Sequence, residues 1–124
     1  GDDIVLIATG ETVQRAYLAS QILKKEGLNS TVISMHTIKP FDKETFLEAV
    51  SDAKVLISLE EHSIYGGLGE MCGSILSQEK ININFKILGI PDEYMINGSQ
   101  SEVLDYYDME PNKISELAKA LMNR

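Results

Sequence analysis

Residues able to do chemistry gather at one place in this chain, directly after an apolar segment. Two glutamates and a histidine are followed by a turn rich in glycine; they are Glu60, Glu61, His62, Gly66, Gly67 and Gly69. Neighbouring carboxylates beside a histidine can shift one another's pKa values. The free amides of a helix that begins at such a turn attract anions. The pattern therefore indicates a candidate anion or interface site at Glu61, His62, Gly66, Gly67 and Gly69.

A structural interpretation of the same residues is available, and we favour it. Glycine lets a chain turn sharply and pack closely, while carboxylates cap backbone amides or form salt bridges at interfaces. The carboxylates of Glu60, Glu61 and Glu70 also make the local field unfavourable for an anion. On this interpretation Gly66 or Gly67 has a positive φ, and its replacement by Ala is predicted to reduce stability.

Two other kinds of site fit the spacings poorly. The glycine turn does not complete a dinucleotide fingerprint, because Cys72 stands where the third glycine belongs. The candidate metal ligands contain no pair at a recognised spacing; they are His36, Glu61, His62 and Cys72. We therefore predict no metal site in this chain.

Strand and helix patterns alternate along the whole sequence and would position these residues. Short apolar runs predict strands at residues 4–9, 30–35, 54–59 and 85–88. Helical spacing of apolar residues predicts helices at 11–26, 43–50, 67–78, 101–106 and 111–122, with Asp42 and Gly27 at helix ends. Parallel neighbours need such helical crossovers. The alternation predicts a single α/β domain, a three-layer α/β/α sandwich with a mainly parallel sheet.

Composition limits the classes of partner. The chain has 124 residues, enough for one domain with its own core, and a formal net charge of -8 without a basic patch. Nucleic acid is not expected as a partner, because phosphate backbones require clustered Lys and Arg. No apolar run approaches the ~18 residues that a membrane span needs. The single cysteine, Cys72, lies in an apolar stretch and favours a buried thiol in a reduced, cytoplasmic protein.

Taken in order, several short motifs resemble the C-terminal domain of the transketolase-like family of thiamine-diphosphate-dependent enzymes. The opening segment 8–13 (ATGETV) and the segment 37–42 (TIKPFD) resemble the elements after the family's first two strands. The most distinctive match is Glu60-Glu61-His62 with the glycine turn Gly66-Gly67-Leu68-Gly69. The segment 91–94 (PDEY), followed by Gly98 and 102–104 (EVL), resembles the closing part of the domain. The resemblance covers essentially the whole chain.

The resemblance implies a mixed sheet of five strands with one antiparallel strand. Four strands are identified above, so the fifth is expected in or near residues 82–90 or in the loop after them. It also implies that thiamine diphosphate and Mg²⁺ bind between two other domains, at a dimer interface. The diphosphate motif Gly-Asp-Gly is absent from this sequence, and the activating glutamate of the family belongs upstream. No catalytic or cofactor-binding residue is therefore expected here.

The implied function is that of a non-catalytic, dimer-supporting domain in an enzyme that transfers a two-carbon ketol unit between sugar phosphates. Residues 1–124 would be a segment or subunit of that enzyme. Its partners would be the remaining domains or a partner subunit, in a homo-oligomer. The stretch Met35-His36-Thr37 favours the transketolase branch over 1-deoxyxylulose-5-phosphate synthase and the 2-oxo-acid dehydrogenase beta subunits. A different alternative is a stand-alone α/β module that binds a small anion at the glycine turn.

Overall fold

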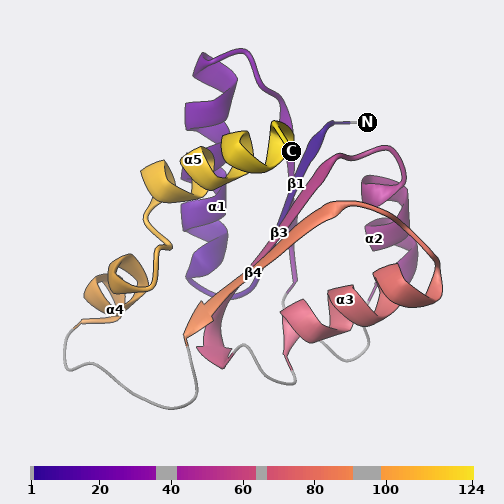
Figure 1. Cartoon of the computed structure of the whole chain (residues 1–124). Helices are drawn as coiled ribbons and strands as arrows, with labels where there is room; N and C mark the ends of the chain where they lie inside the picture. Colours follow the sequence, from indigo (N-terminus) through magenta and orange to yellow (C-terminus); the bar gives the residue numbers. More distant parts are fainter. Residues whose placement is uncertain (1, 36–41, 64–66, 91–98) are drawn as a thin grey trace.

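A parallel sheet forms the centre of the computed structural model, which describes residues 2–35, 42–63, 67–90 and 99–124, without the side chains of 62, 63 and 100. Its strands are β1 (Ile4–Ala8), β2 (Ser30–Ser34), β3 (Val55–Ser63) and β4 (Asn84–Ile90). They are hydrogen-bonded in the order β2-β1-β3-β4 (Figure 1). Every pairing is parallel, with Ile4 opposite both Ser30 and Val55. The carboxyl ends of the strands therefore lie at one edge of the sheet.

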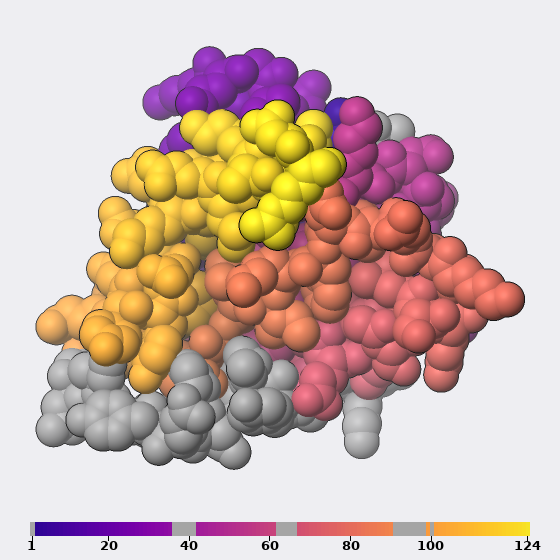
Figure 2. Space-filling model, in the orientation of Figure 1, coloured from indigo at the N-terminus to yellow at the C-terminus, as the bar shows by residue number. Residues whose placement is uncertain are grey.

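Helices cover both faces of this sheet (Figure 1). One face carries α1 (Thr12–Lys25) and α5 (Pro111–Met122), with the short α4 (Gln100–Tyr106) beside them. The other face carries α2 (Lys43–Val50) and α3 (Leu68–Gln78). Asn84 joins the start of β4 to the end of α5, because its side-chain amide donates to the carbonyl of Leu121 at 2.7 Å. Figure 2 shows the yellow end of α5 against the orange β4 segment.

Two hydrophobic clusters fill the spaces between sheet and helices. One lies under α1 and α5 and includes Leu6, Ile57 and Ile114; the other lies under α2 and α3 and includes Ile7, Leu56 and Phe46. Leu56 and Ile57 are both fully buried and belong to different clusters, because successive side chains of a strand point to opposite faces of the sheet. The central strands are thus apolar on both sides, as strands of a covered parallel sheet are.

The helix ends have identifiable causes. Asp42 caps α2, accepting from the backbone N–H of Thr45 at 3.1 Å, and Gly27 follows α1 with φ +82°; both were predicted. Lys80 follows α3 with φ 55°, and Asp108 follows α4 with φ 67°. These two left-handed residues are not glycine, so no sequence signal indicated their conformation.

The predicted elements are confirmed within a few residues, with two differences. The third strand continues to Ser63, four residues beyond the predicted end, and the fourth spans Asn84–Ile90. The described residues form four parallel strands, not the mixed five-stranded sheet that the resemblance implied. Each of β1, β2 and β3 is followed by a helix that returns the chain to the same edge, so each new strand is parallel. Residues 82–90 hold no antiparallel strand, and the loop after them lies outside the described residues.

Membrane insertion has no support in the helices of the described ranges. None of them combines the length and the apolar character that spanning a membrane requires.

Candidate functional site

The extension of β3 places Glu60 and Glu61 on opposite faces of the sheet. Because side chains alternate along a strand, Glu60 follows Leu56 toward α3, and Glu61 follows Ile57 toward α1. The two carboxylates therefore contact the starts of different helices. They do not lie side by side as the pair of neighbouring carboxylates that the sequence suggested. The backbone of His62 belongs to β3, while its side chain and all of Gly66 lie outside the described residues.

Glu60 lies at the first turn of α3. Its side chain is only 3% exposed, and Oε2 accepts a hydrogen bond from the backbone N–H of Gly69 at 2.8 Å. A carboxylate in this position satisfies an amide that has no partner within the helix and lies at the positive end of the helix dipole. Glu60 thus occupies the place that an external anion would need.

Close packing explains the two described glycines of the turn. A Cβ on Gly67 would overlap Oε1 of Glu60, and a Cβ on Gly69 would lie 2.5 Å from Cγ2 of Ile87 on β4. The predicted positive φ is wrong for Gly67, whose φ is -106°. Glycine is required here because a carboxylate and a neighbouring strand leave no room for a side chain, and not because of an unusual backbone angle.

Glu61 makes the corresponding contact on the other face. Its Oε1 accepts from the backbone N–H of Glu11 at 3.2 Å, at the turn between β1 and α1. Gly10 in that turn has φ +57°, and a Cβ there would overlap Oε1 of Glu61. Gly10 therefore satisfies two demands at once, a left-handed backbone and the space for the carboxylate.

Thr12 strengthens the same junction with a further hydrogen bond to β3. Its hydroxyl, fully buried, donates to the carbonyl of Leu59 at 2.9 Å, while the backbone N–H of Thr9 also donates to that carbonyl at 3.1 Å. Thr9, Glu11 and Thr12, around the start of α1, thus all donate hydrogen bonds to the end of β3. Sequence reasoning did not assign Gly10 or Thr12 to the site, although a glycine directly after a buried strand was the available signal.

These contacts lie where an open parallel sheet usually binds ligands. β1 and β3 are neighbours, but β1 leads into α1 on one face and β3 leads into α3 on the other. The crevice at such a topological switch point is the usual ligand position. Here the described side chains of β3 make hydrogen bonds to both flanking helices.

Cys72 lies one turn into α3, fully buried. Burial, followed by the nearby charge of Glu60, raises the pKa of its thiol from 9.0 to about 12. A thiol with such a pKa holds its proton at neutral pH and is a poor nucleophile. This agrees with the predicted buried thiol. Within the described ranges, no three His, Cys, Asp or Glu residues are grouped so that they could hold a metal ion.

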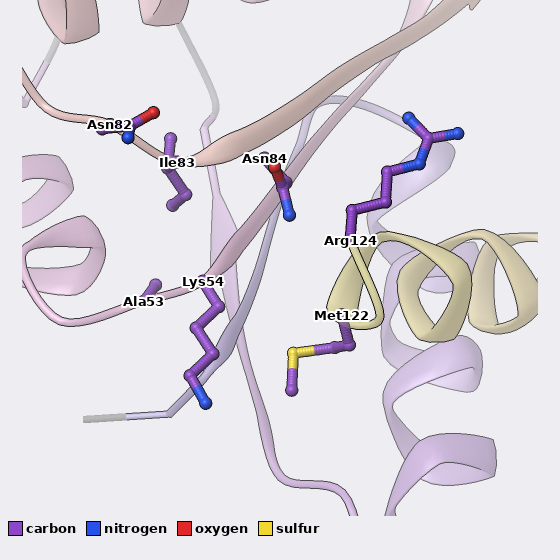
Figure 3. Close-up of a pocket in the computed structure, with 7 residues that line it drawn as sticks. All are labelled: Ala53, Lys54, Asn82, Ile83, Asn84, Met122 and Arg124. Atoms are coloured by element: carbon purple, nitrogen blue, oxygen red, sulfur yellow. The ribbon is translucent and has the colours of Figure 1, made fainter.

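A hollow of about 230 Å³ lies at the opposite edge of the sheet, near the amino ends of β3 and β4. It is lined by Ala53, Lys54, Asn82, Ile83, Asn84, Met122 and Arg124. Figure 3 shows the side chains of Lys54 and Arg124 pointing away from each other. The two cations therefore do not converge on a common ligand position.

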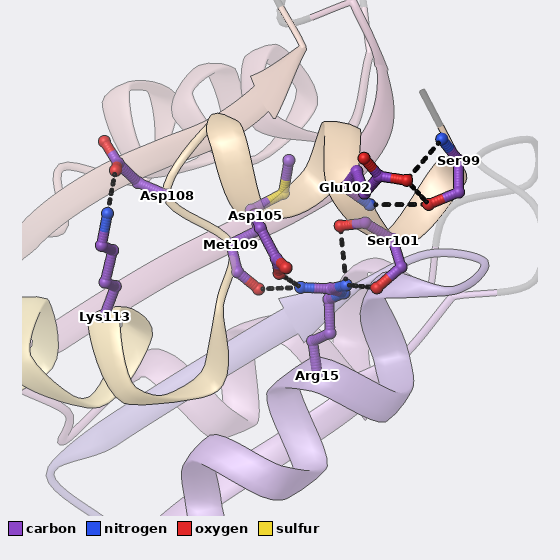
Figure 4. Close-up of polar contacts among 8 residues, drawn as sticks. All are labelled: Arg15, Ser99, Ser101, Glu102, Asp105, Asp108, Met109 and Lys113. Carbon is purple, nitrogen blue, oxygen red and sulfur yellow. Dashed lines mark hydrogen bonds and ion pairs between the residues drawn. The ribbon is translucent and has the colours of Figure 1, made fainter. Parts of the chain in front are cut away.

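A third feature fixes α4 to the body of the domain. Arg15 of α1, whose side chain is 13% exposed, pairs with Asp105 at 2.6 Å. The same guanidinium donates to the carbonyl of Met109 at 3.0 Å and to the carbonyl and hydroxyl of Ser101 at 3.1 and 2.9 Å (Figure 4). One side chain thus holds both ends of a short helix.

Comparison with known proteins identifies the family. The family described as "Transketolase, C-terminal domain" matches residues 1–114. One of the subunits of an apulose-4-phosphate transketolase from Phocaeicola vulgatus is 36% identical over 95% of this chain and 37% of its own length. A 1-deoxy-D-xylulose-5-phosphate synthase of Halothermothrix orenii is 32% identical over 99% of this chain and 20% of its own length. The chain belongs to the transketolase C-terminal domain family.

A solved structure agrees with this assignment. A split-gene transketolase, described as an inactive beta4 tetramer, superposes with a TM-score of 0.87 at 26% identity, over 99% of this chain and 40% of that one. Transketolase of Pichia stipitis shares the fold, with a TM-score of 0.69 at 24% identity over 97% of this chain and 16% of its own. The chain therefore spans less than half the length of each of these relatives.

Proposed function

We propose that this chain is the non-catalytic C-terminal domain of a transketolase-like enzyme that transfers a two-carbon ketol unit between sugar phosphates. The match to a transketolase subunit from Phocaeicola vulgatus over 95% of the chain supports this assignment. A 1-deoxyxylulose-5-phosphate synthase is the alternative parent, supported by the match to relatives of that name. The role of the domain in either parent is to pack on a neighbouring domain and extend the dimer contact.

The contacts of Glu60 carry the structural part of this proposal. Its buried carboxylate accepts from the N–H of Gly69 at the start of α3, so the most distinctive motif of the sequence maintains the fold. This contact also argues against the rival function, a free-standing module that binds an anion at the glycine turn. An external anion would have to displace Glu60 and approach the exposed carboxylate of Glu70.

Thiamine diphosphate and Mg²⁺ are proposed for the parent enzyme, with their ligands outside this chain. The described residues do not fit a diphosphate with its metal ion, since the start of α3 already holds a carboxylate and like charges repel. We place the cofactor with the remaining domains or a partner subunit, in a cytoplasmic homo-oligomer. A relative named as one subunit of a transketolase and one described as a split-gene tetramer are consistent with a split parent enzyme.

The isolated chain is expected to bind no thiamine diphosphate and to catalyse no ketol transfer. Calorimetry with the cofactor and Mg²⁺ tests the first point, and a coupled ketol-transfer assay tests the second. Co-expression with a chain from the same genome that carries Gly-Asp-Gly and the upstream glutamate is the matched positive arm. It is expected to give a co-purifying, active complex. Saturable binding of the cofactor to the isolated chain at micromolar concentration would contradict the proposal.

A further inference from the structure

The start of α3 has the features of an anion site, yet its ligand is part of the chain. The helix begins after a glycine turn, at the carboxyl edge of a parallel sheet, where ligand phosphates are commonly bound. Within the described residues, the group found against the Gly69 amide is the carboxylate of Glu60, 3% exposed and 2.8 Å from the nitrogen. The fit is tight, because a Cβ on Gly67 would overlap Oε1 of the same carboxylate.

We infer that Glu60 is a positioning residue that acts as the permanent anion of the α3 N-terminus, holding Gly67 and Gly69 in place without any bound ligand. A buried carboxylate is costly unless hydrogen bonds and favourable charge compensate its lost hydration. Here the Gly69 amide and the helix dipole supply part of that compensation. In return, the carboxylate fixes where α3 starts relative to the end of β3. This inference concerns the domain alone and does not depend on the identity of the parent enzyme.

Glu61 extends the arrangement to the second helix. Its contact with the Glu11 amide fixes the start of α1 on the opposite face of β3. Side chains of one strand therefore contact the start of a helix on each face of the sheet at the topological switch point. The carboxyl edge of the sheet is thus held in shape by the chain's own carboxylates. It needs no bound phosphate to keep that shape.

Chemical rescue tests the inference. The Glu60→Ala variant removes the carboxylate and opens a space at the Gly69 amide, and thermal unfolding is measured in formate or in chloride at equal ionic strength. We expect a lowered Tm that formate raises by about 5 °C at ten times its dissociation constant, while chloride does not. The wild-type protein is expected to show no difference between the two salts.

Glu70 provides the matched control, since it is a glutamate in the first turn of the same helix but is exposed. Glu70→Ala is expected to lower the Tm only slightly and to show no specific response to formate. The inference would be overturned if Glu60→Ala responded no more than Glu70→Ala does, or if the wild type gained the same stabilisation from formate.

A second variant covers the case in which Glu60→Ala does not fold. Glu60→Gln keeps the shape and an acceptor oxygen but removes the charge. Hydrogen exchange of the Gly69 amide is expected to be about tenfold faster in this variant, because a charge-assisted hydrogen bond becomes a neutral one. The Met71 amide, which donates to the Gly67 carbonyl, serves as the internal reference. Equal protection of the Gly69 amide in both proteins would count against a role for the charge.

Discussion

At the scale of single residues, the glycines of α3 differ in what surrounds them. A Cβ on Gly69 would lie 2.5 Å from Ile87, whereas a Cβ on Gly73 would meet Phe85 at an ordinary 3.5 Å. Both residues lie in the same helix, Gly69 in its first turn and Gly73 in its interior. Ile87 and Phe85 both belong to β4, so the two glycines differ in how closely a β4 side chain approaches them.

This pair gives a matched prediction. Gly69→Ala is expected to lower the free energy of unfolding by about 1–3 kcal/mol through overpacking. Gly73→Ala is expected to raise it by up to about 1 kcal/mol, since Ala is the better helix former. Urea denaturation of both variants measures these changes. A neutral Gly69→Ala would show that Ile87 can move aside without cost.

The thiol of Cys72 permits a prediction about pH. Its pKa is raised from 9.0 to about 12 in the folded protein, so the unfolded chain loses this proton first as pH rises. The thiol's contribution to stability is complete below about pH 9 and is lost as pH rises toward 12. Stability should therefore fall more steeply over this range in the wild type than in Cys72→Ala. Urea denaturation at several alkaline pH values measures the two slopes, and equal slopes would contradict the shift.

Among the elements, α4 depends most clearly on one side chain. It has only 7 residues, too few for a helix to persist on its own in water. Its capping box at Ser99 and Glu102 satisfies the first amides, and Arg15 supplies the tertiary attachment. The position of α4 is therefore set by a residue of α1 that is far from it in the sequence.

Replacing Arg15 by Lys tests this attachment while keeping the charge. Lys lacks the planar fork that reaches Asp105, Ser101 and Met109 together, so the free energy of unfolding is expected to fall by about 1–3 kcal/mol. Lys43→Ala is the control, because its pair with Glu79 is 3.5 Å long and largely exposed, and such pairs contribute about 0–1 kcal/mol. Equal losses in the two variants would mean that Arg15 has no special part in docking α4.

The limits of sequence reasoning are also clearest at the scale of elements. A continuous apolar run such as residues 4–9 is stable only when it is buried, so it reads clearly as a strand. Such runs were predicted almost to the residue. The third strand was ended too early because Glu60 and Glu61 interrupt its apolar pattern. Their charges are accommodated by the amides of Gly69 and Glu11, which are distant contacts that no local pattern reveals. The close approach of Gly69 to Ile87 was equally invisible.

At the scale of the whole molecule, the alternation of strands and helices was enough to predict a parallel sheet with helices on both faces. The strand order was not predicted, because it depends on which face each crossover covers. Those of the predicted residues that the structure describes do lie at the carboxyl edge of the sheet, but their contacts could not be foreseen. These contacts depend on Glu60 and Glu61 facing different helices, a distinction that requires the register of β3.

The shared central strands have a consequence for cooperativity. β1 and β3 contribute alternate side chains to both hydrophobic clusters, so Leu56 and Ile57 belong to different clusters while being neighbours in one strand. Neither layer of helices can detach without exposing apolar side chains of strands that the other layer still needs. The two halves are therefore not separate folding units, and the domain should unfold in a single all-or-none transition. Within a larger enzyme, such a domain offers its neighbours either its complete folded surface or, once unfolded, no surface at all.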